Sequence, residues 1–182
     1  MMSQPLAERL RPKTLDDYIG QKHLVGQGAV LRKMIDAGRV PSFILWGPPG
    51  VGKTTLAQII ANKLDAPFYT LSAISSGVKD VREVIEKAKS NRFFNTVSPI
   101  LFIDEIHRFS KSQQDSLLNA VETGVVTLIG ATTENPSFEV IRPLLSRCQV
   151  YVLKSLDKND LLTLLHKACL LYTSDAADEL DG

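Results

Sequence analysis

The feature that most constrains this chain is a glycine-rich octapeptide at residues 47–54, GPPGVGKT, which fits the pattern G-x-x-x-x-G-K-[ST]. An apolar run at residues 43–46 precedes it, and apolar residues with helical spacing follow it. A strand, a glycine-rich turn and a helix in this order predict a loop whose backbone N–H groups cradle phosphates. The residues expected to bind the nucleotide through this loop are Gly47, Pro48, Pro49, Gly50, Val51, Gly52, Lys53, Thr54 and Thr55.

Two side chains of this octapeptide carry specific chemistry. Lys53 brings a mobile ammonium group to the β- and γ-phosphates, and Thr54 offers its hydroxyl to Mg²⁺. The helix that follows adds the positive end of its dipole. The sequence therefore predicts a site for ATP with Mg²⁺.

Five short stretches rich in apolar and β-branched residues are predicted to be buried strands. They are nearly continuous apolar runs, which is typical of a parallel sheet covered on both faces. Segments with helical spacing follow the first three of them. This alternation predicts an α/β fold with right-handed crossovers around a five-stranded parallel sheet. The predicted strands are residues 43–46, 68–71, 100–104, 126–131 and 149–153.

Two adjacent carboxylates, Asp104 and Glu105, end the third predicted strand. Because side chains alternate along a strand, we expect them to project differently. Asp104 is expected to hold Mg²⁺ through water together with Thr54, and Glu105 to polarise the water that attacks the γ-phosphate. Such a pair alone more often marks an ordinary strand end, but after a phosphate loop it favours hydrolysis. His107 is expected to be a surface or hinge residue.

Composition narrows the class of protein. A chain of 182 residues that is 44% apolar suits one domain with a sizeable core. Its net charge of +1 becomes +5 over residues 1–168, and this modest surplus permits contact with nucleic acid without requiring it. No apolar run approaches the length needed to cross a bilayer, and the first residues lack the apolar core of a secretion signal. Two cysteines, Cys148 and Cys169, do not suggest a disulfide framework, so we expect a reducing cytoplasm and no membrane partner.

The last fourteen residues break the pattern. Residues 169–179 read CLLYTSDAADE, which matches in order the translation of a transposase sequencing adapter. We therefore expect residues 169–182 to be an artefact of translation, and the authentic chain to leave off near Ala168 within a truncated helical lid.

Three further segments give the chain a family resemblance to AAA+ ATPases of the clamp-loader and branch-migration branch. Residues 10–21, LRPKTLDDYIGQ, resemble the segment that lies against adenine, which implies contacts from Arg11, Pro12 and Ile19. Residues 131–133, ATT, resemble sensor 1, with Thr133 as the expected sensor and Thr132 as the alternative. Residues 145–148, LSRC, resemble the motif whose arginine, here Arg147, reaches the γ-phosphate of a neighbouring subunit.

Finer blocks resemble the replication-associated recombination protein A family (RarA, also MgsA), related to the Werner-helicase-interacting ATPases. They are residues 71–82, LSAISSGVKDVR, residues 107–115, HRFSKSQQD, and residues 130–140, GATTENPSFEV. The resemblance implies a three-layer P-loop core and an ATP-driven homo-oligomer at stalled replication forks. It also implies binding to single-strand/duplex DNA junctions and to single-strand-binding protein, with a nucleoid-associated location in the cytoplasm.

The expected organisation follows from the motifs and this resemblance. Residues 1–40 would form the adenine-side segment, 41–154 the ATPase core and 155–168 the start of a helical lid that is mostly missing, with its C-terminal oligomerisation region. Three alternatives stay open: a Holliday-junction branch-migration motor, a clamp-loader-like subunit, and a nucleotide-binding module with negligible hydrolysis. Candidate DNA-facing residues are Lys79, Arg82, Arg108 and Lys111.

Overall fold

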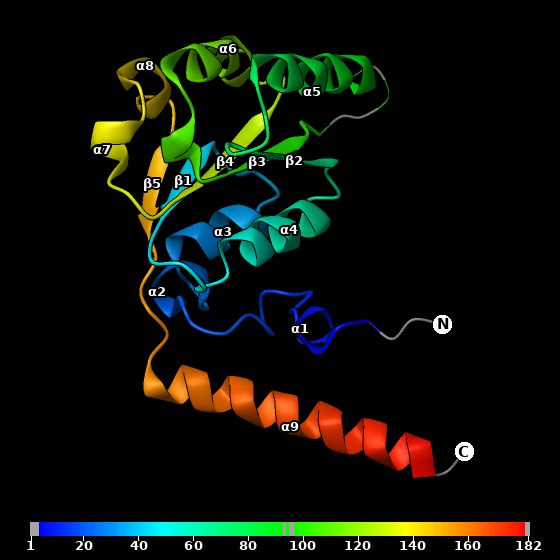
Figure 1. Cartoon of the computed structure of the whole chain (residues 1–182). Helices are drawn as coiled ribbons and strands as arrows, with labels where there is room; N and C mark the ends of the chain where they lie inside the picture. The colour runs from blue at the N-terminus through cyan, green and yellow to red at the C-terminus, as the bar shows by residue number, and fades with distance from the viewer. Residues whose placement is uncertain (1–3, 93, 95–96, 181–182) are drawn as a thin grey trace.

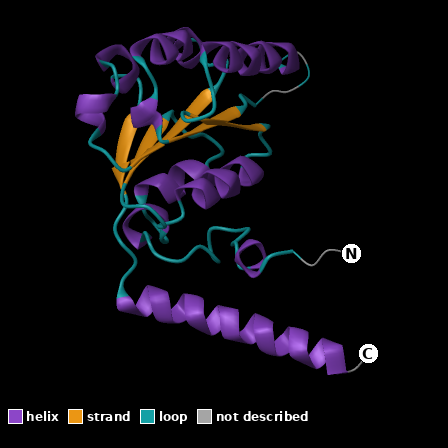
Figure 2. Cartoon of the chain, viewed as in Figure 1, coloured by secondary structure: helices purple, strands orange, loops and turns teal. Residues whose placement is uncertain are grey.

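The computed structural model describes residues 4–92, 94 and 97–180, and its core is a three-layer α/β/α sandwich (Figures 1 and 2). Residues 1–3 of the expected N-terminal segment and 181–182 of the expected artefact lie outside the described residues. All pairings in the sheet are parallel, in the order β2-β3-β4-β1-β5, so the predicted five-stranded parallel sheet is confirmed. The strands are β1 (Phe43–Trp46), β2 (Phe68–Ser72), β3 (Ile100–Asp104), β4 (Thr127–Thr132) and β5 (Gln149–Val152).

The strand bounds differ from the predicted ones by at most one residue at each end. The largest consequence is at β4, which runs on to Thr132 because this residue pairs with Trp46 in the register of β1 and β4. Val126, predicted as strand, instead donates its N–H to the carbonyl of Ala120 and belongs to the turn that follows a helix. The sensor-like threonines therefore stand at the carboxyl end of a central strand.

Two layers of helices cover the sheet (Figure 1). On one face lie α3 (Val30–Asp36) and α4 (Lys53–Lys63), with the short α2 (Lys22–Val25) beside them. The opposite face carries α5 (Val78–Asn91), α6 (Lys111–Glu122), α7 (Pro136–Glu139) and α8 (Arg142–Leu145). A short α1 (Leu6–Arg9) and a 3₁₀ turn, η1 (Ile106–Arg108), complete this part of the chain.

Alternating side chains of the strands build both layers. Phe43 and Leu45 of β1 belong to the cluster shared with α3 and α4, whereas Ile44 belongs to the cluster shared with α5 and α6. All three are completely buried. Burial on both faces explains why these strands are continuous apolar runs in the sequence.

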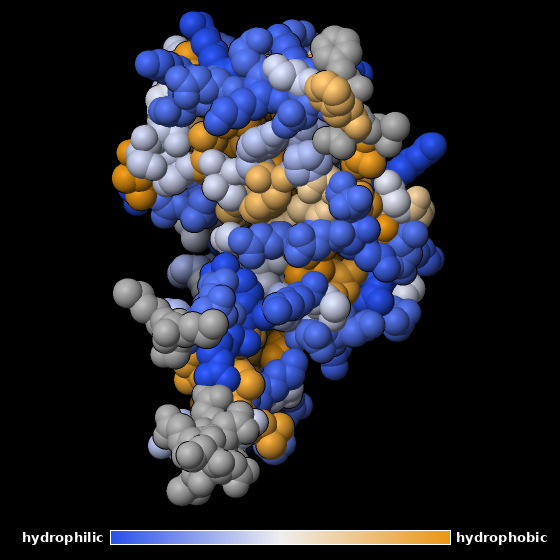
Figure 3. Space-filling view, turned by 90° about the vertical axis from the view of Figure 1, so that its right-hand side faces the viewer, coloured by the Kyte–Doolittle hydropathy of each residue, from blue (hydrophilic) through white to orange (hydrophobic). Residues whose placement is uncertain are grey.

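The C-terminal helix α9 (Lys158–Leu180) lies apart from the sandwich, on the far side of the N-terminal segment (Figure 1). It passes through Ala168 without a break, because residues 169–180 contain neither glycine nor proline. Hydrophobic atoms are visible beside it at the bottom of Figure 3, and five of its apolar side chains are 50–74% exposed. These are Leu161, Leu162, Leu165, Leu170 and Tyr172. Among the described residues, no helix is both long enough and apolar enough to span a membrane.

Candidate functional site

Two adjoining cavities lie beside the glycine-rich loop. The first, called here the loop cavity, has a volume of about 690 Å³ and is lined by the loop and by the residues that end β3 and β4. The second, called the α9 cavity, has a volume of about 520 Å³ and lies between residues 9–19, the loop and α9. Both volumes are in the range of small-molecule sites. Seven residues line both cavities, so the two form a continuous site: Leu10, Arg11, Pro12, Gly50, Gly52, Thr55 and Leu164.

The loop has the backbone conformation that the motif predicts. Gly50 and Gly52 have φ of 77° and 90°, in the left-handed region that favours glycine. A Cβ at Gly52 would also crowd Tyr18, since it would lie 3.0 Å from the hydroxyl. Lys53 then begins α4, so the loop N–H groups and the helix N-terminus lie together.

The ammonium group of Lys53 rests on the loop itself. Its Nζ donates to the carbonyl of Gly47 at 2.6 Å and to that of Pro48 at 3.1 Å. Burial lowers the pKa of Lys53, and the negative charge of Asp104 acts in the opposite direction. Gly47 and Pro48, predicted as nucleotide contacts, do not line either cavity; they hold Lys53 instead.

Tyr18 is a residue of this site that the sequence did not reveal. Its buried hydroxyl is the donor to the carbonyls of Val51 and Gly52, at 3.0 and 3.1 Å. Burial raises the pKa of Tyr18, so the phenol stays protonated and able to donate. Tyr18 thus ties the N-terminal segment to the phosphate loop.

The two carboxylates at the end of β3 both line the loop cavity. Asp104 accepts a hydrogen bond from the N–H of Glu105 at 3.0 Å, and Glu105 has a left-handed backbone with φ of 52°. The Oε2 atom of Glu105 is buried, makes no hydrogen bond to the described residues, and lies 3.4 Å from Nε of Arg108. A buried carboxylate oxygen of this kind has capacity left to accept a hydrogen bond from a water molecule.

Thr132 and Thr133 have different environments at the end of β4. Thr132 is 1% exposed, and its hydroxyl lies 2.9 Å from Nδ1 of His107 and accepts the N–H of Glu134 at 2.9 Å. Thr133 is exposed, lines the loop cavity and makes no hydrogen bond with the described residues. His107, expected at the surface or in a hinge, thereby connects the turn after Glu105 to the sensor-like strand.

The residues predicted to hold Mg²⁺ fit that ion. Thr54, in the first turn of α4, and Asp104, at the end of β3, both line the loop cavity. A hydroxyl and a carboxylate are the hard oxygen donors that Mg²⁺ prefers, with its remaining positions kept by water and phosphate.

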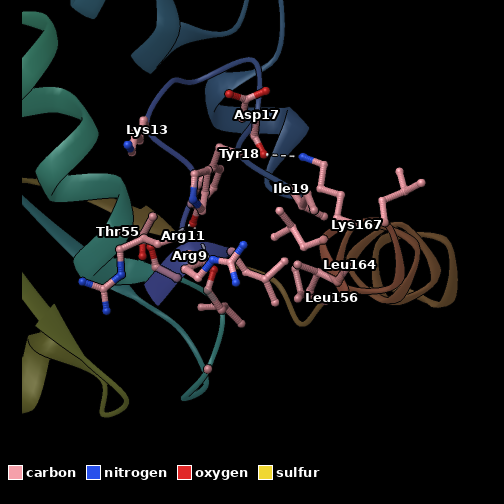
Figure 4. Close-up of a pocket in the computed structure, with 17 residues that line it drawn as sticks. Arg9, Arg11, Lys13, Asp17, Tyr18, Ile19, Thr55, Leu156, Leu164 and Lys167 are labelled. Atoms are coloured by element: carbon pink, nitrogen blue, oxygen red, sulfur yellow. Dashed lines mark hydrogen bonds between the residues drawn. The ribbon is translucent and has the colours of Figure 1, made fainter. Parts of the chain in front are cut away.

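The α9 cavity contains the residues predicted to contact adenine. Arg11, Pro12 and Ile19 line it together with Leu156 and Leu164. Figure 4 shows Arg11 and Ile19 on the side of the N-terminal segment and Leu164 on α9. The aliphatic side chains that line the cavity suit the face of a purine ring, and charged side chains such as Lys13 and Asp17 line it as well. Figure 4 also shows Lys167 of α9 reaching the N-terminal segment, where its Nζ donates to the carbonyl of Asp17 at 3.2 Å.

Arg147 is separate from the other predicted site residues. It lines neither cavity, is exposed, and forms an ion pair with Glu122 at 2.8 Å. Its guanidinium also donates to the carbonyl of Pro143. The structure therefore brings Lys53, Thr54, Asp104, Glu105 and Thr133 to one cavity and leaves Arg147 outside it.

Comparison with known proteins agrees with this geometry. Residues 43–156 match the family model described as "ATPase family associated with various cellular activities (AAA)". Over 164 residues the chain is 54% identical to Replication-associated recombination protein A of Haemophilus influenzae, covering 90% of this chain and 36% of that protein. It is 53% identical to ATPase WRNIP1 of Dictyostelium discoideum, covering 90% of this chain and 18% of that protein.

Solved structures agree with the fold. A structure of the Thermotoga maritima RuvB Holliday junction branch migration motor superposes with a TM-score of 0.73 at 32% identity, covering 90% of this chain and 55% of that one. In the sequence comparisons, the chain spans about a third of the length of the bacterial recombination proteins it matches.

Proposed function

This chain belongs to the AAA family of ATPases, and on that premise we propose that it binds ATP with Mg²⁺ and hydrolyses it to ADP and phosphate. The proposal extends to its setting, in which the chain is the motor of a DNA-associated oligomer in replication-linked recombination and repair. The observation that carries the proposal is the convergence of Lys53, Thr54, Asp104 and Glu105 on one cavity.

Nucleotide binding divides between the two cavities. The loop N–H groups and Lys53 would hold the phosphates in the loop cavity, and the α9 cavity would take the base against its aliphatic side chains. To reach a phosphate, Lys53 exchanges its hydrogen bonds with Gly47 and Pro48 for charge-assisted ones to phosphate oxygens. Thr54 and Asp104 would hold Mg²⁺, which, when bound, neutralises charge on the β- and γ-phosphates.

Hydrolysis needs a water molecule placed in line with the γ-phosphate. Glu105 is suited to orient and polarise that water, because its buried Oε2 has no hydrogen-bond partner among the described residues. Both threonines line the loop cavity, and Thr133 is the better candidate for the sensor, since it makes no hydrogen bond with the described residues while the hydroxyl of Thr132 is occupied by His107 and Glu134.

Arg147 supports an oligomeric mechanism. A guanidinium that stabilises the transferring phosphoryl group has to reach it, and Arg147 does not line the cavities of its own chain. We assign it to the γ-phosphate held by a neighbouring copy. Glu122, its partner here, would be the group it leaves on assembly.

The cellular role rests on the relatives. Replication-associated recombination protein A and ATPase WRNIP1 are more than 50% identical to this chain. The first of these names supports a role in replication-linked recombination. We further propose, from the family resemblance of the motifs, that the chain acts at replication forks with DNA and single-strand-binding protein in the nucleoid region of the cytoplasm. A Holliday-junction motor is the second candidate, favoured by the superposition with RuvB at lower identity.

The proposed chemistry is tested by Glu105→Gln. The amide keeps the size of the side chain but cannot polarise water, so single-turnover hydrolysis of radiolabelled ATP should fall by about 10²–10⁴-fold. ATP affinity, measured by calorimetry, should stay within about threefold of wild type, since Glu105 holds neither phosphate nor base. Glu83→Gln, an exposed change on α5, is the matched control. Turnover near wild type in Glu105→Gln would remove Glu105 from the mechanism.

A further inference from the structure

Residues 18–21 touch both the phosphate loop and the connection between β5 and α9. At one end, Tyr18 holds two carbonyls of the loop. At the other, the side chain of Gln21 makes two hydrogen bonds to the backbone of Lys154, which lies in the connection between β5 and the start of α9 at Lys158. The segment therefore lies between the part of the site that would bind phosphate and the helix that walls the base cavity.

The hydroxyl of Tyr18 orients the peptide that joins Val51 to Gly52 and supports the peptide that joins Gly52 to Lys53. In a planar trans peptide the C=O and the N–H point in opposite directions. The carbonyl of Gly52 also accepts the N–H of Leu56, the first hydrogen bond of α4, whereas the carbonyl of Val51 is held by Tyr18, so the N–H of Gly52 points away from the phenol. The N–H groups of Gly52 and Lys53 both belong to the phosphate-binding motif, so the hydroxyl sets the orientation of the Gly52 donor and reinforces that of the Lys53 donor.

The contact of Gln21 is a two-point clamp. Its Oε1 accepts the N–H of Lys154 at 2.9 Å, and its Nε2 donates to the carbonyl of the same residue at 2.6 Å. The side chain is only 5% exposed, so neither amide atom is readily satisfied by bulk water if the clamp opens. A buried amide with both ends on one residue fixes the position of that residue.

Backbone conformation between the two contacts is specialised for this approach. Gly20 has φ of 83°, and a Cβ there would lie 2.7 Å from Cδ2 of Leu156. Gln21 also has a left-handed backbone, with φ of 56°, which is uncommon for a residue other than glycine. These two left-handed residues bring the segment against the connection between β5 and α9.

Two neighbouring contacts hold the same region. A ring nitrogen of His23 lies 2.8 Å from the carbonyl of Val152, and Lys167 of α9 donates to the carbonyl of Asp17 (Figure 4). Five apolar side chains of α9, by contrast, are at least half exposed. The position of α9 over the base cavity therefore depends strongly on this N-terminal segment.

From these contacts we infer that residues 18–21 are a strut that couples the phosphate loop to the placement of α9, with Tyr18 and Gln21 as positioning residues. The inference rests on the proposed nucleotide binding. A ligand that fixes the loop fixes the Tyr18 contact, and through Gln21 it stabilises the connection at Lys154. Such a coupling has to be measured, because proximity alone does not establish it.

The Lys154 amide reports directly on the contact with Gln21, since its N–H donates a hydrogen bond to the Gln21 side chain. Hydrogen exchange of this amide is measured by NMR on the ¹⁵N-labelled chain, with and without saturating ADP and Mg²⁺. In wild type, ADP should slow exchange at Lys154 by about fivefold or more, the lower end of typical coupling between sites. In Tyr18→Phe, ADP at saturation should slow it less than twofold. Tyr69→Phe, which removes a hydroxyl bonded to Asn91 away from the site, should behave as wild type.

Gln21 is tested in the same experiment. Gln21→Ala should give fast exchange at Lys154 with or without ADP. Gln21→Glu keeps the acceptor for the Lys154 N–H and loses the donor, so the Lys154 amide should stay protected from exchange without ADP. This variant keeps the test informative if the alanine variant does not fold. In a double-mutant comparison, adding Gln21→Ala to Tyr18→Phe should not reduce the ADP effect further.

Failure of the strut and failure of nucleotide binding are distinguishable. A wild-type chain that shows no ADP-dependent shifts in the loop would overturn the proposed function, and with it this inference. A Tyr18→Phe chain that binds ADP and still slows Lys154 exchange as strongly as wild type would overturn the strut alone. In that case α9 would respond to the nucleotide by direct contact.

Discussion

The sheet and helix α9 both contribute to the nucleotide site, but they are held in place by very different amounts of burial. The central strands carry fully buried side chains on both faces, such as Phe43 and Ile44 of β1. Helix α9 leaves five apolar side chains at least half exposed and is held by the N-terminal segment. Chemistry at the phosphates therefore depends on a rigid scaffold, whereas the base cavity depends on a loosely packed wall.

Substitution of Arg147 has the largest expected effect on ATP turnover, and it tests whether the core of one chain can hydrolyse ATP without a neighbouring copy. If it acts on a neighbour's ATP, turnover per chain should rise with protein concentration, and Arg147→Ala should lower turnover by about 10³-fold or more. Mixing Arg147→Ala with Lys53→Ala should restore part of the activity, because an intact arginine then faces an intact phosphate loop. Confirmed subunit exchange without any recovery would contradict the assignment.

Matched leucines compare the stability of the two regions directly. Leu101 of β3 is fully buried, so Leu101→Ala should lower the free energy of unfolding by about 2–5 kcal/mol. Leu165 of α9 is 62% exposed, so Leu165→Ala should change it by less than about 0.5 kcal/mol. Urea titrations measure both values. Equal losses for the two variants would show that α9 is as firmly packed as the sheet.

Deletion of residues 169–182 should have the smallest effect. Leu170 and Leu171 line the α9 cavity, but Leu170 is 58% exposed and Leu171 only half-buried. The melting temperature should stay within about 2 °C of wild type, the scale of a sub-kcal/mol change in a chain of this size. A drop of about 10 °C would show that this tail contributes to the fold and would contradict its proposed origin in adapter sequence.

Local signals explain what the sequence could predict. The strands, the phosphate loop and the carboxylates at the end of β3 are set by neighbouring residues, so motif and periodicity located them. Thr132 and Thr133 are adjacent, and only the register of β4 with β1 separates the buried hydroxyl from the exposed one. The sequence alone therefore left Thr132 as an alternative to Thr133 for the sensor.

Long-range contacts explain which site residues could not be predicted from the sequence. The bond from Tyr18 to Val51 spans 33 residues, and the clamp of Gln21 on Lys154 spans 133. Neither residue type has a motif that marks such a partner, because tyrosine and glutamine occur in many buried and exposed settings. Helix α9 was expected to be a short start of a lid, and its continuation to Leu180 follows from the absence of a residue that would end it.

The central claim is that this chain binds ATP through the glycine-rich loop, and calorimetric titration with ATP and Mg²⁺ tests it most directly. Lys53→Ala removes the ammonium group from the phosphates, and because charge-assisted hydrogen bonds are lost, ATP affinity should fall by at least about tenfold. Lys63→Ala, an exposed lysine at the other end of α4, should bind as wild type does. A folded Lys53→Ala chain with unchanged ATP affinity would contradict the account.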